Sequence, residues 1–417
     1  MPRRGRLIAA LTMLLSVLAL TGTAQAAVTR LQAPNSALFG LSVALSADGS
    51  TALVGAPSTD SAQGAAFVFA RSGGNWVLQQ KLKAAVPSPV GITRFGFSVS
   101  LSADGRTALI GAQGSNPAVG GADTAYVFAR TAFSGFSQQQ QLLNPAGAFS
   151  GNQFGNSVSL SSDGRTALVG APSPPSGSGG VGGGAVYTFA RGLVGWTLQQ
   201  KLGVNSASFD AFGYSVSVSS DGRSALIGAP SKDGTGAAYL FARGLAGGFV
   251  RQQQLLAAGL AAGDGFGQSV SLSGDARTAV IGAPDKAVGP AGGAGAAYVF
   301  ARGVVGGFTQ QQQLQPASRA ANDQFGNAVS LDRGGTRALV GASGTDAEKG
   351  AAYVFGRGFA GGFTQRQRLQ ADDRADGDFF GWAAALSADS SVSLLGAPQI
   401  GGDGPRNGAA YAFTGLG

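Results

Sequence analysis

One phrase of about nineteen residues recurs seven times along this chain, and its period limits the fold more than any other feature. In the copy that spans residues 212–230 the phrase reads FGYSVSVSSDGRSALIGAP. Successive copies begin 54 to 59 residues apart. A repeat of this length is one supersecondary unit that cannot bury its own hydrophobic face, so neighbouring copies must stack on one another. The copies begin at Phe39, Phe95, Phe154, Phe212, Phe266, Phe325 and Phe380.

Each repeat is expected to form four short β-strands, A to D. The phrase begins with alternating polar and apolar side chains that include β-branched residues, which predicts a strand. Asp221-Gly222 is a preferred two-residue hairpin turn, and Pro230 ends the second strand because proline cannot donate to a ladder. For this copy the predicted strands are 212–219, 224–229, 237–242 and 249–256.

Four antiparallel strands per repeat are typical of a propeller blade, so we expect an all-β, seven-bladed β-propeller. The last repeat stops after its third strand, at residues 409–413. Residues 28–33 (VTRLQA) resemble the fourth-strand residues 367–371 (QRLQA). We therefore expect the N-terminal strand to complete the last blade, which closes the ring and covers an exposed strand edge.

The recurring Phe-Gly pairs are predicted to be structural. Burial of an aromatic ring between blades contributes roughly 1.5–3 kcal/mol. A glycine beside it removes a Cβ where two backbones crowd together.

The first 26 residues are typical of an export signal. Arg3, Arg4 and Arg6 precede an apolar run at residues 7–20, and Ala24-Gln25-Ala26 offers a cleavage site with small residues. We therefore predict a signal peptide at 1–26 and a single propeller domain at 27–417. The mature protein is expected to be secreted or periplasmic, without a segment that inserts into a membrane.

The composition excludes several classes of function. The chain contains no cysteine and no histidine, which rules out disulfides, Ser-His nucleophile pairs and imidazole metal ligands. The formal net charge is +8, but the basic residues are scattered at repeat positions. Because they form no basic run with interleaved aromatics, we expect no binding to nucleic acid.

Three short motifs carry a family resemblance: Phe212-Gly213, Gly228-Ala229-Pro230 and residues 238–241 (AYLF). Together they resemble the FG-GAP repeat, the blade unit of the integrin α-chain propeller and of many secreted bacterial proteins. The resemblance covers residues 31–413 and implies a propeller for adhesion or extracellular binding. Two blades depart from it, with Gln113 and Ser343 in place of the proline.

Calcium is not expected to bind, although the resemblance raises that question. In the calcium-binding blades of the family, the A–B connection carries several spaced Asp or Asn residues. Here it reads Ser162-Asp163-Gly164-Arg165, and one carboxylate cannot supply the six to eight oxygens that calcium takes. We therefore predict no metal and no cofactor. The aspartates of these connections, Asp48, Asp104, Asp163 and Asp221, are predicted to be turn residues.

Antiparallel connectivity divides the loops between two faces of the disc. The A–B and C–D turns form one face, which we call the uniform face because its Asp-Gly-Arg and Ala-Arg-Gly sequences recur around the ring. The B–C and D–A loops form the variable face, which differs in length between blades and carries more acidic residues. Binding residues usually lie on variable loops of a rigid scaffold, so we expect the ligand, an extracellular protein or glycan, on the variable face of a monomer.

A set of acidic residues on the variable face is a candidate ligand rim. Four of them lie two residues before a repeat phenylalanine, where equivalent positions of different blades converge. An alternative is that these carboxylates cap the turn into strand A through local backbone bonds. The candidates are Asp210, Asp264, Asp323, Asp376 and Asp378.

These observations favour a non-catalytic binding or adhesion module. Two alternatives remain open, a structural or surface-display propeller and a hydrolase that uses carboxylates. A glycosidase needs two carboxyl groups about 5–9.5 Å apart, and no pair departs from the repeat pattern. The positions of Trp76, Trp196 and Trp382 do not indicate a platform for stacking sugars.

Overall fold

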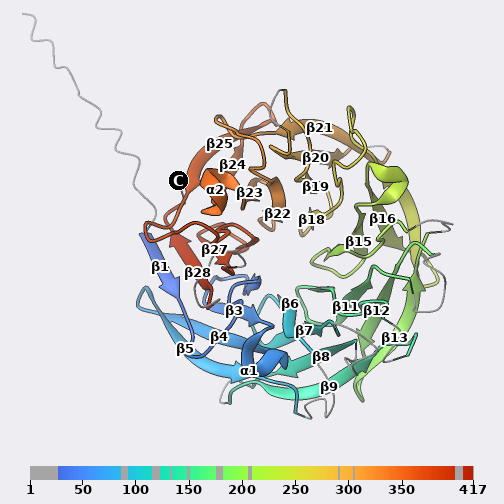
Figure 1. Cartoon of the computed structure of the whole chain (residues 1–417). Helices are drawn as coiled ribbons and strands as arrows, with labels where there is room; N and C mark the ends of the chain where they lie inside the picture. Colours follow the sequence, from blue (N-terminus) through green and yellow to red (C-terminus); the bar gives the residue numbers. More distant parts are fainter. Residues whose placement is uncertain are drawn as a thin grey trace, which may run out of the picture.

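The computed structural model shows a ring of seven four-stranded antiparallel sheets around a central axis (Figure 1). It describes residues 27–85, 93–114, 123–131, 134–147, 151–174, 182–204, 209–289, 292–303, 306–399 and 407–416. The predicted signal peptide lies outside these residues. The all-β, seven-bladed propeller expected from the repeats is therefore confirmed.

Every blade has the strand order A-B-C-D, and the A strands of neighbouring blades lie next to one another around the axis. Blades 1 to 4 contain β2 (Ser42–Leu45), β3 (Thr51–Ala56), β4 (Ala65–Ser72), β5 (Asn75–Leu82), β6 (Phe95–Leu101), β7 (Thr107–Ala112), β8 (Thr124–Ala129), β9 (Ser137–Leu143), β10 (Ser157–Leu160), β11 (Thr166–Ala171), β12 (Ala185–Arg191), β13 (Trp196–Leu202), β14 (Ser215–Val218), β15 (Ser224–Ala229), β16 (Ala237–Arg243) and β17 (Phe249–Leu255). Blades 5 to 7 contain β18 (Ser269–Leu272), β19 (Thr278–Ala283), β20 (Ala296–Arg302), β21 (Phe308–Leu314), β22 (Phe325–Leu331), β23 (Arg337–Ala342), β24 (Ala351–Arg357), β25 (Phe363–Leu369), β26 (Ala383–Leu386), β27 (Val392–Ala397), β28 (Ala409–Thr414) and β1 (Ala27–Leu31).

Within the residues that the structure describes, the few helical turns lie in B–C loops. They are α1 (Thr59–Ala62), α2 (Thr345–Glu348) and the 3₁₀ turn at Lys232–Gly234. In α1 and α2 the central residues Asp60 and Asp346 have φ values of 53° and 54°, so each turn includes left-handed backbone. Within the described residues, no helix has the length and apolar character needed to cross a membrane.

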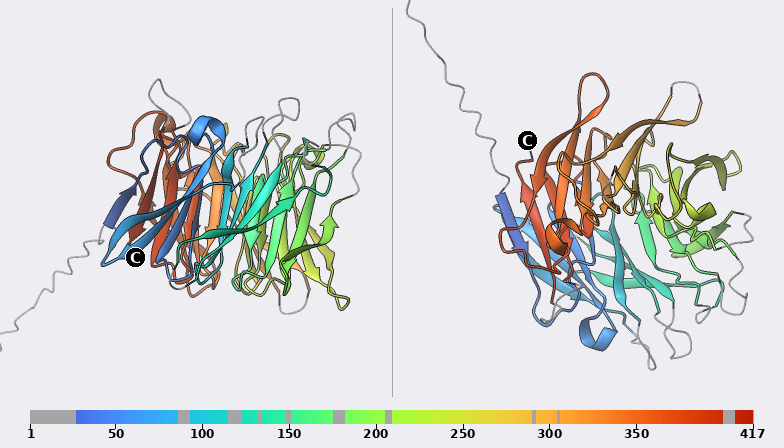
Figure 2. Two further views of the ribbon diagram at one scale, coloured as in Figure 1. Left: turned by 90° about the horizontal axis from the view of Figure 1, so that it is seen from below. Right: turned by 45° about the horizontal axis from the view of Figure 1, so that its top comes forward.

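The N-terminal strand closes the ring, as the sequence predicts. Strand β1 pairs antiparallel with β28, with Val28 opposite Phe413, and becomes the outer strand of blade 7. Its last residue, Leu31, is buried in the apolar cluster between blades 7 and 1. Figure 2 shows β1 beside the C-terminal blade, at the rim of the disc.

The A–B turn differs from the prediction. Ser219 N donates to Ser224 O at 2.9 Å, so the loop between the paired strands has four residues instead of two. Only Gly222 within it has a positive φ, of 68°, whereas a two-residue turn of the expected type requires two such residues. Strand A is also shorter than predicted, because a separate tight turn holds Phe212 outside it.

The aspartate of this turn has the structural role that the sequence predicts. The carboxylate of Asp221 accepts hydrogen bonds from Ser219 Oγ at 2.6 Å and from the backbone N of Arg223 at 2.9 Å. Partial burial acts to raise the pKa of Asp221, but these hydrogen bonds outweigh it and lower the pKa below its usual value. Asp48, Asp104 and Asp163 accept the equivalent pair of bonds.

A closed ring of backbone hydrogen bonds joins the seven A–B turns around the axis. In each bond, an N–H of one turn donates to the carbonyl oxygen of the next turn, at 2.8–3.2 Å. The uniform face therefore has a continuous hydrogen-bonded centre. The bonds run from Ala47 to Ala103, to Ser162, to Ser220, to Gly274, to Arg333, to Ala388 and back to Ala47.

Glutamine side chains join neighbouring blades at the outer rim. Gln253 donates from Nε2 to Phe308 O at 2.8 Å, and its Oε1 accepts from Phe308 N at 2.8 Å. Strand β1 has Thr29 at the equivalent position, so the contact between blade 7 and blade 1 forms without this pair of bonds. The other glutamines that make it are Gln80, Gln140, Gln200 and Gln312.

The repeat phenylalanines pack between blades, as predicted. Phe212 is fully buried in a cluster that includes Val186 of blade 3 and Ile227 of blade 4. Its ring meets those of Tyr239 and Phe241 edge-on, with centroids 5.6 and 6.0 Å apart. Seven such clusters, one at each boundary between blades, form the core.

Truncation of one repeat phenylalanine is expected to be strongly destabilising. Phe212→Ala should lower the free energy of unfolding by about 3–5 kcal/mol, because it leaves a cavity between two blades. Urea unfolding followed by tryptophan fluorescence measures this change. Phe359→Ala is the matched control, since Phe359 is fully exposed. Equal unfolding midpoints for the two variants would contradict the packing role.

Candidate functional site

A tight turn before each strand A places two side chains at the mouth of the axis on the variable face. In blade 4 the turn spans Ala211 to Tyr214, with Tyr214 N donating to Ala211 O at 3.0 Å. Ala211 has a φ of 57°, a strained conformation for a residue with a Cβ. Because strand A is innermost, the residues before Phe212 and after Gly213 lie beside the axis.

The same turn forms in all seven blades, and its two free positions are where the repeat phrase varies most. Aromatic and amide side chains dominate the second position, the first position is mixed, and Arg94 is the one charged residue among them. The first positions are Leu38, Arg94, Gln153, Ala211, Gly265, Gln324 and Phe379, all with positive φ. The second positions are Leu41, Phe97, Asn156, Tyr214, Gln268, Asn327 and Trp382.

A hollow of about 470 Å³ lies over blades 3 to 5 at this mouth. The turns contribute Gln153, Tyr214 and Gln268 to its wall, and the surrounding loops contribute Phe209 and Asp285. Phe209 and Tyr214 are 47% and 41% exposed, whereas the repeat phenylalanines pack between blades. The hollow therefore presents aromatic surface together with two amide groups.

The ionisable groups of this hollow are perturbed by burial and by one another. Desolvation and the carboxylate of Asp285 raise the pKa of Tyr214, so its hydroxyl stays protonated and able to donate. Desolvation and the carboxylate of Asp264 raise the pKa of Asp285. The hollow thus offers a phenol donor, a carboxylate acceptor and two amides that donate and accept.

A larger hollow of about 790 Å³ lies over blade 6 and has a different character. One of its carboxylates is paired within the protein: Asp346 forms ion pairs with Arg368 at 2.8 Å and with Arg374 at 3.0 Å. Although partial burial acts to raise it, these arginines lower the pKa of Asp346. Because Asp346 of the larger hollow is already paired with two arginines, while the smaller hollow exposes two aromatic rings, we regard the smaller hollow as the better binding site.

One aromatic pair stands beside the larger hollow. Phe379 and Trp382 meet edge-on, with centroids 6.0 Å apart, and Trp382 is 36% exposed. Both lie on the tight turn of blade 7, so aromatic surface occurs on two separate parts of the mouth.

The predicted acidic residues lie in four different D–A loops, and Asp376 and Asp378 share one of them. Asp264 and Asp323 are buried, and each accepts a hydrogen bond at 2.6 Å from the backbone N three residues earlier. Asp378 makes the same bond, while Asp210 is fully buried 3.4 Å from Lys232 Nζ. This geometry favours the interpretation that the carboxylates cap turns, and a role in ligand binding stays a prediction.

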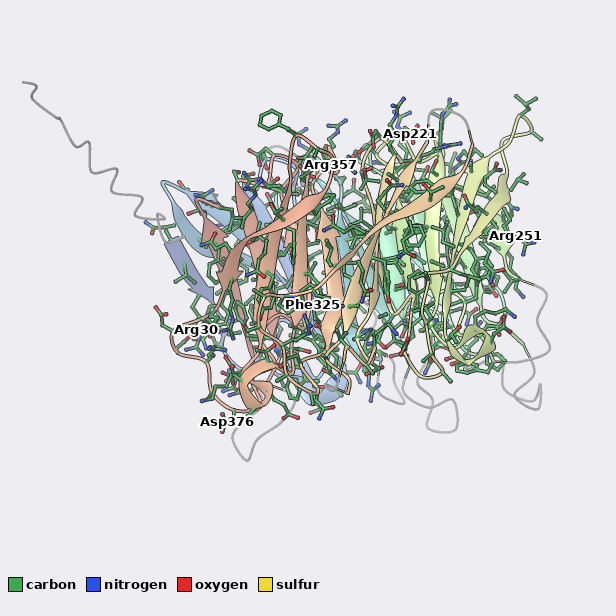
Figure 3. All side chains as sticks on the ribbon, turned by 90° about the horizontal axis from the view of Figure 1, so that it is seen from above. Arg30, Asp221, Arg251, Phe325, Arg357 and Asp376 are labelled. Carbon is green, nitrogen blue, oxygen red and sulfur yellow. The ribbon has the colours of Figure 1, made fainter. Side chains whose placement is uncertain are left out.

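The fifth candidate, Asp376, is exposed and forms an ion pair with Lys349 at 3.3 Å. Figure 3 shows Asp376 at the variable face, opposite the edge that carries Asp221 and Arg357. Within the described residues, no group of three or more acidic side chains is arranged to hold a metal ion.

Sequence reasoning missed the aromatic and amide residues of the mouth. Phe209, Tyr214 and Trp382 fall outside any motif, and a search for repeated chemistry overlooks them. The sequence does contain a signal for Tyr214 and Trp382, because the residue after Phe-Gly varies between copies while the residues on either side of it recur.

Comparison with known proteins places this geometry among repeat propellers. A family model described as "FG-GAP repeat" matches residues 136–189, 196–241, 249–300, 308–355 and 363–413. Each match begins at strand D of one blade and ends in strand C of the next. No curated protein matches the sequence.

Several solved structures are similar to this chain. A periplasmic gluconolactonase from Pseudomonas aeruginosa is 16% identical over 80% of this chain and 86% of its own, with a TM-score of 0.53. A putative 6-phosphogluconolactonase from Bacteroides fragilis is 16% identical over 80% and 85%, with a TM-score of 0.55. The WD40 repeats of RRP9 are 10% identical over 93% and 97%, with a TM-score of 0.56. At these identities the similarity shows the fold alone.

Proposed function

This chain belongs to the FG-GAP repeat family, and on that premise we propose that it is a secreted, non-catalytic binding module whose ligand occupies the variable face. The hollow over blades 3 to 5 carries the proposal. It combines exposed aromatic rings with amide groups on a rigid scaffold, the usual composition of a specific binding site.

The chemistry of the hollow favours a neutral polar ligand, and we propose a glycan. A sugar ring has an apolar face of C–H groups that packs on an aromatic side chain such as Phe209 or Tyr214. Its hydroxyl groups match the amides of Gln153 and Gln268, which both donate and accept hydrogen bonds. A strongly cationic or anionic ligand would leave most of these groups unused.

A catalytic role is less well supported. Hydrolysis by paired carboxylates needs two acidic groups free to act, and Asp285 lines the hollow beside Asp264. Asp264, however, accepts from the backbone N of Ala261 and from Lys286 Nζ, the latter at 2.9 Å. The lactonase names belong to structural neighbours of low identity and assign no activity to this chain.

Binding to a glycan array, followed by calorimetry with the best ligand, tests the proposal. Phe209→Ala and Tyr214→Ala should each weaken binding roughly tenfold or more, because each removes aromatic area that the ligand would cover. Leu256→Ala is the matched control, since Leu256 is also exposed at the variable face but lies outside the hollow.

Unchanged affinity in both aromatic variants would place the ligand elsewhere and contradict the site. If the folded protein bound neither glycans nor matrix proteins, the structural or surface-display alternative would be favoured. Glucono-lactone hydrolysis above the buffer rate would instead favour an enzyme.

A further inference from the structure

Several C–D hairpins on the uniform face end in fully exposed apolar side chains. Leu193 and Val194 lie at the tip of blade 3, Leu245 at the tip of blade 4 and Phe359 at the tip of blade 6. Each is more than 100% exposed relative to the reference for its residue type. Three blades therefore present an exposed apolar side chain at the same hairpin of the uniform face.

The backbone at these tips is ordered by its own hydrogen bonds. Gly247 N donates to Gly244 O at 2.9 Å, and Gly244 N donates to Gly248 O at 2.8 Å. Leu245 is therefore a central residue of a closed turn, and its side chain projects from the turn. Phe359 occupies the equivalent position in the turn that Gly358 and Gly361 close.

The hairpin itself does not require an apolar tip. In blade 1 the C–D connection is shorter: Gly73 and Gly74 alone join the paired residues Ser72 and Asn75, whereas residues 244–248 make the connection in blade 4. Blade 1 shows that a C–D connection in this fold can form with small and polar residues alone. The apolar side chains in blades 3, 4 and 6 need another explanation.

Arginines surround these tips. Arg243 stacks its guanidinium on the Phe249 ring, 4.8 Å from the centroid, and donates to Gly247 O at the base of the turn. Arg357 lies in the same way over Phe363 in blade 6, and Figure 3 shows Arg357 at this edge of the disc. The arginines of this face outnumber its aspartates, and they are Arg71, Arg106, Arg130, Arg165, Arg191, Arg223, Arg243, Arg277, Arg302, Arg333, Arg337 and Arg357.

The aspartates of this face compensate only part of that charge. Each lies on an A–B turn and is bonded locally, as Asp221 is to Ser219 and Arg223. They are Asp48, Asp104, Asp163, Asp221, Asp275, Asp332 and Asp389. The uniform face is therefore basic, with apolar protrusions.

We propose that the uniform face docks on the surface of an anionic lipid bilayer. The apolar tips enter the boundary between headgroups and acyl chains, and the arginines bind lipid phosphates. The tips lie on separate blades but on the same face of the disc, so a flat bilayer surface can contact all of them at once. A second copy meeting this face with its own would bring two arginine-rich surfaces together, which like-charge repulsion disfavours.

This orientation would hold the variable face away from the membrane. The docking surface and the glycan site lie on opposite faces, so the inference does not rest on the proposed ligand. It supplies the attachment that a binding module needs in order to act at a surface.

Flotation of the purified protein with vesicles tests the docking. The vesicles are phosphatidylcholine with and without about 30% phosphatidylglycerol, whose charge mimics an anionic leaflet. The test variant combines Leu193→Ser, Leu245→Ser and Phe359→Ser. The control combines Leu143→Ser, Leu198→Ser and Leu256→Ser, which removes three large apolar side chains from exposed positions away from the hairpin tips.

We expect the parent and the control to float with anionic vesicles. The partition coefficient of the tip variant should be lower by roughly a hundredfold or more, because three apolar side chains that would leave water on binding are replaced by serine. Flotation of the tip variant equal to that of the parent would overturn the proposal. So would a failure of the parent to bind either vesicle. If the tips instead mediate a dimer in solution, sedimentation will show a dimer that the tip variant loses, which also overturns it.

A second measurement reports insertion directly. Because the chain has no cysteine, Leu245→Cys can be labelled at one site with a polarity-sensitive dye, with Leu256→Cys as the control on the opposite face. Anionic vesicles should shift the emission of the first label to the blue and leave the second unchanged. Equal responses of the two labels would contradict docking through the uniform face.

Discussion

A single methyl group added at Gly228 is expected to lower the free energy of unfolding by about 5 kcal/mol or more. Gly228 lies in strand β15, and its φ is not positive, so alanine fits the local backbone. The added Cβ would instead overlap the carbonyl oxygen of Gly267 in the next blade. That carbonyl already accepts from Ser215 Oγ at 2.8 Å, so it cannot move away without breaking the contact between blades.

Urea unfolding of Gly228→Ala beside Gly292→Ala isolates this steric effect. Gly292 also has no positive φ, and a Cβ there meets nothing within 4 Å. The control should keep the unfolding midpoint of the parent. A similar small change in both variants would show that the blades can separate enough to admit a methyl group.

The same close approach explains why two motifs define the repeat. A Cβ on the glycine of each Gly-Ala motif would meet the carbonyl oxygen of the next Phe-Gly glycine. A Cβ on that second glycine would meet a strand C carbonyl of the preceding blade, as Gly267 would meet Ala237 O, and its φ is positive. A residue with a side chain at either position would push two blades apart. The pairs are Gly55 with Gly96, Gly111 with Gly155, Gly170 with Gly213, Gly228 with Gly267, Gly282 with Gly326, Gly341 with Gly381 and Gly396 with Gly40.

The architecture was predictable because its signals are local in the sequence. A period of 54 to 59 residues defines the repeated unit, and alternating polar and apolar side chains define the strands within it. Strand B, residues 224–229, was predicted with its correct bounds, because a glycine-containing turn and a proline delimit it. Strand A was predicted too long. The turn that shortens it depends on a left-handed Ala211, which no local propensity favours.

The candidate site was predicted less well, for a physical reason. Carboxylates are common binding groups and were therefore predicted to form the site. Asp264 and Asp323, however, accept hydrogen bonds from the backbone of their own loops and are buried there. The mouth is instead built from the side chains of Tyr214 and Gln268, whose proximity depends on how successive blades meet around the axis. One sequence gives the order of these residues but not the angle between blades.

Removal of the closing strand is expected to lower the free energy of unfolding by about 5 kcal/mol or more and to cause self-association. A chain that begins at Gln32 lacks the β1–β28 ladder and the buried side chain of Leu31. Loss of a buried leucine side chain alone costs about 2–5 kcal/mol, and each lost backbone hydrogen bond adds about 0.5–1.5 kcal/mol. The exposed edge of β28 then becomes a template for pairing with another chain.

Blade 7 should be the most weakly held blade of the ring, because within the described residues the glutamine pairs that join the other blades at the rim form at neither of its boundaries. Point variants separate strand pairing from side-chain burial: Leu31→Ala should destabilise the protein, and Val28→Ala, at an exposed position of the same strand, should not. A peptide of residues 27–33 added to the shortened chain should restore the monomer and raise the melting temperature, because it supplies the missing strand. A shortened chain that stayed monomeric with the parent's melting temperature would contradict this role of β1. It would show that contacts between neighbouring blades, and not the β1–β28 ladder, set the stability of the ring.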